Sequence, residues 1–128
     1  MSNIRIMNVR VFNDLLDQLF EYLEYTFPFY KSDIILSKTG IELLRKSNYR
    51  LVVMQFIEHI YPYAIQINNC DENFFVNFEK NLNLDKNNLL IGMKIKSIWT
   101  AQDTTKKQKA TIFYYFQKLI QSASKCIN

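Results

Sequence analysis

The scarcity of residues that make tight turns constrains this chain more than any other feature. Its 128 residues include only two glycines, Gly40 and Gly92, and two prolines, Pro28 and Pro62. Sheet proteins usually need more of both, because tight turns require special backbone angles. Hydrophobic residues make up 48% of the chain, which favours a folded protein over a disordered one. The sequence therefore predicts an all-α fold, with one compact domain of five or six helices over residues 1–128.

A hydrophobic stripe with helical spacing predicts the first helix over residues 8–27. At 100° per residue its apolar side chains share one face. They are Val9, Phe12, Leu15, Leu16, Leu19, Phe20, Leu23 and Phe27. The opposite face carries an acidic stripe made of Asp14, Asp17, Glu21 and Glu24. Pro28 ends this helix, since the residue before a proline is disfavoured in the helical region.

The next two helices are predicted over residues 32–46 and 49–61. Each has a candidate cap at its start, a residue whose side chain can accept a hydrogen bond from a free amide. The candidates are Ser32 or Asp33 for the helix over 32–46, and Asn48 for the helix over 49–61. Their core candidates are Ile34, Ile35, Ile41, Leu43 and Leu44 in the former, and Leu51, Val52, Phe56, Ile57 and Ile60 in the latter. The run RLVVMQF also fits a strand. We favour helix, because the apolar spacing continues and no hairpin turn follows.

Aromatic residues dominate the remaining predicted helices. Asp71 is expected to cap a short helix whose three phenylalanines enter the core: Phe74, Phe75 and Phe78. A helix over 86–99 would present to the core Leu89, Leu90, Met93, Ile95 and Trp99. The last helix, over 104–124, follows the cap candidate Asp103.

The last helix divides into a core face and a lysine row. Its core face comprises Ile112, Phe116, Leu119, Ile120 and Ala123, with Phe113 at the edge. The opposite side, at about 200–240° from Ile112, carries Lys107, Tyr114, Lys118 and Lys125. This row could dock on an acidic protein, or bind phosphates while the phenol ring stacks on a base. An ordinary solvated face gives the same pattern.

Net charge agrees with a basic C-terminal segment. Residues 1–80 hold eight Lys or Arg and ten Asp or Glu, which sums to −2. Residues 81–128 hold eight Lys and two acids, which sums to +6 and gives +4 for the chain. Such a segment can attract phosphates or an acidic protein surface. The acidic stripe could in turn meet the lysine row of another copy, so a homo-oligomer is a further option.

No catalytic, cofactor-binding or metal site is predicted. Two separate glycines cannot form a phosphate-cradling loop. His59 is the only histidine, and a Cys–His pair would need Cys70 or Cys126 to reach it in space. The acidic stripe lacks the Glu-x-x-His partners of a helical metal site.

Three segments carry a resemblance. They are YPYAIQINNCDENFF, KIKSIW and TIFYYFQKLI, within roughly residues 50–120. Their order resembles a set of small uncharacterised helical proteins of large eukaryotic, nucleocytoplasmic DNA viruses. The resemblance implies a viral origin and a helical fold, and supplies no reaction or ligand. The spacer TAQDTTKKQKA is more basic than the set leads us to expect.

These observations together predict a non-enzymatic viral adaptor or host-interaction domain that docks on a viral or host protein through charged helix faces. The alternative is a nucleic-acid-binding accessory protein that uses the basic C-terminal helix. No secretory signal and no apolar run of about 20 residues is present. We therefore expect no membrane partner and no secretion, and a location in the host cytoplasm or nucleus, or within the virion.

Overall fold

A computed structural model describes residues 3–81, 90 and 93–127. This part of the chain is helical and contains no β-strand, which confirms the all-α prediction. In chain order its elements are α1 (Asn3–Thr26), the 3₁₀ turn η1 (Pro28–Tyr30), α2 (Lys31–Ser47), α3 (Leu51–His59), the 3₁₀ turn η2 (Tyr61–Tyr63), α4 (Ala64–Asn68), α5 (Asn73–Val76), α6 (Phe78–Asn81), α7 (Ile95–Thr100) and α8 (Lys106–Ser124). Among these, α1, α2, α3 and α8 have nine or more residues, and the other α-helices have six or fewer.

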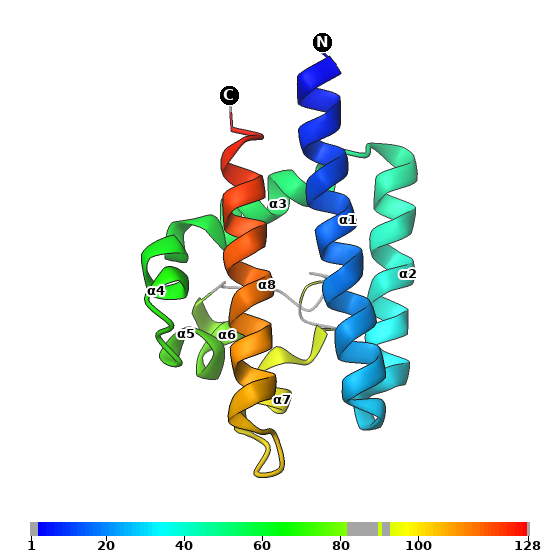
Figure 1. The fold of residues 1–128 in the computed structure, drawn as a ribbon. Coiled ribbons are helices and arrows are strands. Elements are labelled where there is room, and N and C mark those ends of the chain that lie inside the picture. Colours follow the sequence, from blue (N-terminus) through cyan, green and yellow to red (C-terminus); the bar gives the residue numbers. More distant parts are fainter. Residues whose placement is uncertain (1–2, 82–89, 91–92, 128) are drawn as a thin grey trace.

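Helix α1 lies between α2 and α8 and packs most extensively against these two. It runs down the view of Figure 1, while α2 and α8 run up on either side, so both are antiparallel to it. The Asn8 side chain donates to the Lys125 carbonyl at 3.1 Å, which ties the start of α1 to the end of α8. The two chain ends therefore lie at the same end of the molecule (Figure 1).

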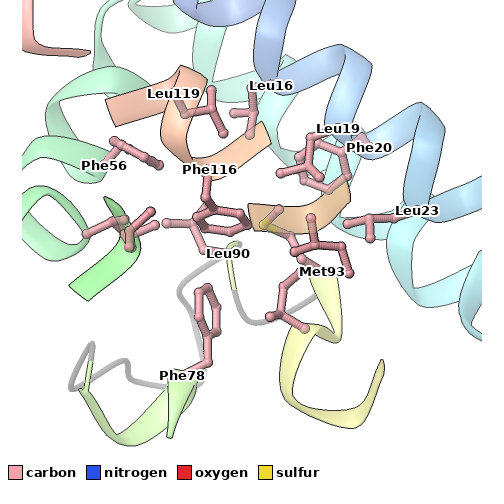
Figure 2. Packing of buried hydrophobic residues seen from close by; sticks show 14 of the residues in the cluster. Leu16, Leu19, Phe20, Leu23, Phe56, Phe78, Leu90, Met93, Phe116 and Leu119 are labelled. Atoms are coloured by element: carbon pink, nitrogen blue, oxygen red, sulfur yellow. The ribbon is translucent and has the colours of Figure 1, made fainter. Parts of the chain in front are cut away.

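The shorter helices pack beside α8 and supply aromatic rings to the core. Helix α4 contacts α8, and α5 contacts α7. Phe116 of α8 is fully buried, with its ring centroid 5.0 Å from that of Phe75 and 6.1 Å from that of Phe78. Figure 2 shows Phe116 in the middle of the cluster, with Leu16 and Leu119 above it and Phe78 below. The predicted burial of the three phenylalanines is confirmed.

Two helix starts differ from the predictions. Helix α8 is capped by Thr105, and the prediction of Asp103 is wrong. Thr105 Oγ1 accepts from the Gln108 amide at 3.1 Å, and Gln108 Oε1 accepts from the Thr105 amide at 2.9 Å, a reciprocal capping box. Helix α2 follows η1 directly, so Ser32 and Asp33 lie inside its first turn and cap nothing.

The other two predicted caps, Asn48 and Asp71, are not the N-cap residues, which are Arg50 for α3 and Glu72 for α5, but their side chains form turns at these helix starts. Asn48 Oδ1 accepts from the amide of Arg50, just before α3, at 3.0 Å. Asp71 Oδ1 accepts from the amide of Asn73, the first residue of α5, also at 3.0 Å. Both carboxamide and carboxylate therefore bind a free amide two residues on, as in an Asx turn. Phe27 leaves the helical region at φ −123° and ψ 69°, so α1 ends before Pro28 as predicted.

The α2 core prediction is partly wrong. Ile34 and Ile41 are buried, but Ile35 and Leu43 are exposed. Helix α2 lies at the edge of the molecule in Figure 1, where its outer side has no described neighbour. Its buried face is therefore narrower than its apolar spacing suggests.

The predicted helix over 86–99 is also wrong in its extent. Lys94 has φ 60°, in the left-handed region, so a regular α-helix cannot pass through it and α7 starts at Ile95. Leu89 lies outside the described residues. The other core candidates of this segment are buried as predicted: Leu90, Met93, Ile95 and Trp99.

Candidate functional site

The predicted lysine row lies outside the core on α8. Tyr114 is 55% exposed, Lys107 and Lys125 are exposed, and Lys118 is half-buried. The core face of the same helix is buried throughout: Ile112, Phe116, Leu119, Ile120 and Ala123. The angular assignment of the two faces is therefore confirmed.

Tyr114 and Lys118 contact each other within this row. The Lys118 ammonium lies 5.6 Å from the centroid of the Tyr114 ring, within the range of a cation–π contact. Residues four apart on a helix are neighbours, so the helix itself sets this geometry. Tyr115 approaches the same ring edge-on, with a centroid distance of 5.7 Å. Tyr114 thus contacts both neighbours while its side chain stays 55% exposed.

The charges of the row are not neutralised within the described part of the chain. Lys107, Lys118 and Lys125 form no ion pair with a carboxylate there. Helix α8 itself has four lysines and no acidic residue. The outer side of α8 therefore presents uncompensated positive charge.

The acidic stripe of α1 is in a different situation. Asp17, with its side chain 40% exposed, accepts from Arg45 of α2 at 2.7 Å. Arg45 also donates to the Asn13 carbonyl at 3.2 Å, so this ion pair joins α1 to α2. Asp17 thus has a structural partner that the sequence analysis did not foresee.

The other three acidic residues of the stripe differ in their surroundings. Glu21 and Glu24 line a shallow depression that Lys31 and Lys38 of α2 also line. Asp14 is exposed and takes part in no ion pair within the described residues. Of the four acidic residues, Asp17 alone has an ion-pair partner among the described residues, and two others share a depression with lysines of α2.

A pocket on the other flank of α8 was missed in the sequence analysis. It has a volume of about 510 Å³, and we call it the Trp99 pocket. Its lining residues are Cys70, Glu72, Trp99, Lys106, Lys109, Ala110, Phe113, Tyr114 and Gln117. They come from α7, α8 and the turn between α4 and α5, which only the tertiary fold brings together. One feature of the sequence could have indicated this pocket. Lys106 and Lys109 lie on either side of Phe113 around the α8 axis, each within about 60° of it.

The walls of the Trp99 pocket are held by side-chain contacts. Glu72 Oε1 accepts from the Trp99 indole at 3.2 Å and lies 3.7 Å from the Lys109 ammonium. That ammonium also sits 5.3 Å from the centroid of the Trp99 ring. Among the other lining residues, Gln117 Nε2 donates to the Ile67 carbonyl at 3.1 Å and contacts Cys70 Sγ at 3.4 Å.

Neither cysteine pairs with the histidine among the described residues. Cys70 contacts Gln117, and Cys126 Sγ lies 3.5 Å from the Ser122 carbonyl. Burial raises the pKa of the Cys126 thiol, and the charge of Arg50 offsets part of that rise. His59 Nε2 lies 3.9 Å from the Glu58 carboxylate instead.

The described residues lack two further features. They contain no group of three or more His, Cys, Asp or Glu side chains placed to hold a metal ion. Within the same residues, every helix is too short or too polar to cross a lipid bilayer.

Comparisons with known proteins add no relative. No family model matches the chain, and neither the curated proteins nor the solved structures contain a significant match to it. The viral origin implied by the three resembling segments therefore stays a prediction.

Proposed function

We propose that this protein is a non-enzymatic interaction domain that docks on an acidic surface of a protein partner through the outer face of α8. The uncompensated charge of Lys107, Lys118 and Lys125 carries this proposal. These residues extend over about 27 Å at the 1.5 Å rise of an α-helix. An acidic surface of that length would neutralise all three and would be steered toward them from a distance.

The aromatic residues of α8 favour a protein partner over nucleic acid. Single-stranded nucleic acids gain affinity when bases stack on open aromatic faces. Trp99 and Phe113 are only 2% and 7% exposed, and Lys118 lies over the Tyr114 ring. The one exposed ring of the row, Tyr114, is shared with Lys118, so the row fits carboxylates at least as well as it fits bases.

Nucleic-acid binding remains the second candidate, because lysines bind phosphates without any stacking. The acidic stripe contributes little to either candidate, since Arg45 of α2 pairs with Asp17, and Lys38 of α2 lines the same depression as Glu21. Self-association between the acidic stripe and the lysine row of another copy therefore has less support than docking on a different protein. The resemblance to viral proteins would make the partner a viral or a host protein.

Charge reversal tests the proposal. We would replace Lys107, Lys118 and Lys125 by Glu, and compare proteins recovered with the tagged variant and with the wild type from cells that express them. We expect the variant to lose a defined set of partners while its helical content stays unchanged. An unchanged partner set would contradict docking through this face.

A matched control keeps the change in net charge the same. Replacing Lys31, Lys38 and Lys46 of α2 by Glu alters three lysines on another helix. The control should retain the partners that the α8 variant loses. Equal losses would indicate an effect of net charge alone.

Salt dependence separates the two candidates. A nucleic-acid binder should shift labelled duplex DNA or single-stranded RNA at low salt, and lose about 0.9 logarithmic units of affinity per phosphate contact for each logarithmic unit of salt on duplex DNA. We expect no complex with either probe. A complex with that salt slope, absent in the α8 variant, would establish the second candidate.

A further inference from the structure

The Trp99 pocket has an apolar floor beneath a basic rim. Trp99 and Phe113 are buried and form the floor, while Lys106 and Lys109 lie at its edge. Ala110 follows Lys109 on α8, is exposed and also lines the pocket, and its small side chain takes up little of this space. The volume of about 510 Å³ falls within the ~300–1,000 Å³ of known ligand pockets. An apolar group of the size of an aromatic or leucine side chain therefore has room here.

The charge around this pocket favours an anionic partner. Among the described residues, Glu72 is the only acidic one that lines it, and its Oε1 is occupied by the Trp99 indole and by Lys109. Lys106 lines the same pocket and forms no ion pair with a carboxylate in the described part of the chain. Two lysines against one carboxylate leave the rim with a net charge of +1.

The basic surface continues beyond the rim. Lys107 follows Lys106 in the first turn of α8, and Lys118 lies over Tyr114, which lines the pocket on its outer side. From Lys106 to Lys118 the helix rises by about 18 Å. An extended acidic segment can meet charges over that length, whereas a single small ligand in the pocket cannot.

We propose that the Trp99 pocket receives one large apolar side chain from an acidic segment of the partner, while carboxylates on either side of that side chain meet the lysines of α8. This inference rests on the proposed docking function and specifies the chemistry of the partner. A buried apolar anchor surrounded by charge is the usual arrangement of an energetically dominant contact. The lysines supply orientation and rate of association, and the anchor supplies residence time.

The single tryptophan of the chain makes this pocket directly observable. Trp99 is the only source of tryptophan fluorescence, so its emission reports on occupancy. We would titrate the protein with three synthetic peptides of about nine residues, each with glutamates and aspartates around a central Phe, Leu or Tyr. We expect a saturable change in emission with at least one peptide, weakened by salt. Replacing the central residue by Ser should weaken binding about tenfold or more.

A variant that fills the pocket gives the decisive comparison. Ala110→Phe places a ring in the opening from an exposed helix position, and Ser124→Phe makes a similar change at an exposed position of α8 outside the pocket. Ala110→Phe should weaken peptide binding about tenfold or more, and Ser124→Phe should leave it unchanged. No saturable change with any of the three peptides, or equal affinities of the two variants, would overturn the assignment of the pocket.

Failure of the pocket and failure of the docking face give different results. In one case, Ala110→Phe recovers the full set of cellular partners, while the charge reversal of Lys107, Lys118 and Lys125 loses them. That result would support docking through the outer face of α8 and contradict the proposed role of the pocket. In the other case, the charge-reversal variant retains every partner and binds the peptides as tightly as the wild type. That result would contradict the proposed docking function itself.

Discussion

At the residue scale, Phe116 connects the two halves of the core. Its ring packs edge-on against Phe75 and Phe78, which come from the short helices. Its own helix packs against α1, whose Leu16 and Leu19 are also fully buried. Removal of this ring would leave a void between elements that are fixed by other contacts, so the void could close only in part.

We therefore expect Phe116→Ala to lower the free energy of unfolding by about 3–5 kcal/mol, as for other buried aromatic residues. Urea denaturation followed by circular dichroism would measure the change. Tyr114→Ala is the matched control on the same helix, because its ring is 55% exposed, and should change stability by about 0.5 kcal/mol or less. Similar values for both variants would mean that the two faces of α8 are wrongly assigned.

At the element scale, the start of α8 is determined by a reciprocal pair of hydrogen bonds. Thr105 and Gln108 satisfy each other's amides, and Thr104 Oγ1 donates to the Ile98 carbonyl at 2.6 Å. The latter bond holds the connection against the end of α7. These bonds determine where α8 begins and place Lys106 in its first turn, at the rim of the Trp99 pocket.

Thr105→Ala should lower the free energy of unfolding by about 0.5–2 kcal/mol, because the Gln108 amide loses its side-chain acceptor and the capping box is broken. Asp103→Ala removes the cap that the sequence suggested and should change stability by no more than about 0.5 kcal/mol. Chemical denaturation of both variants under the same conditions measures the difference. A larger loss for Asp103→Ala would show that α8 starts earlier in solution.

At the scale of the whole molecule, the aromatic cluster joins the short helices to the long ones. Trp99 of α7 stacks on Phe75 at a centroid distance of 4.5 Å, and Phe75 packs against Phe116 of α8. Helix α8 packs side by side with α1 (Figure 1). Local loss of α7 would therefore expose rings that α8 needs for its own packing.

This arrangement predicts one cooperative unfolding transition. Trp99 fluorescence reports on α7 and the pocket, whereas circular dichroism at 222 nm reports on all helices. We expect the two signals to give coincident urea transitions, as in a two-state domain. Separate midpoints would contradict the prediction of a single domain over residues 1–128.

Helical periodicity predicted much of the fold and part of the candidate site. The stripes of α1 and α8 place Phe12 and Phe116 inside and Tyr114 outside, because side-chain direction in a long helix follows from spacing alone. Boundaries were predicted less well. Several polar residues precede α8, and only the path of the chain selects Thr105 from among them. The left-handed Lys94 has no marker in the sequence, since such a conformation usually calls for glycine.

The sequence by itself determined that the chain is helical, which faces of the long helices are apolar, and that its C-terminal third is basic. These properties depend on residues close together in the chain. Only the tertiary structure decided which charges are neutralised and where a pocket forms. Arg45 reaches Asp17, and Glu72 reaches Trp99, across 28 and 27 positions of sequence. Such contacts depend on how whole helices pack, and no local pattern contains that information.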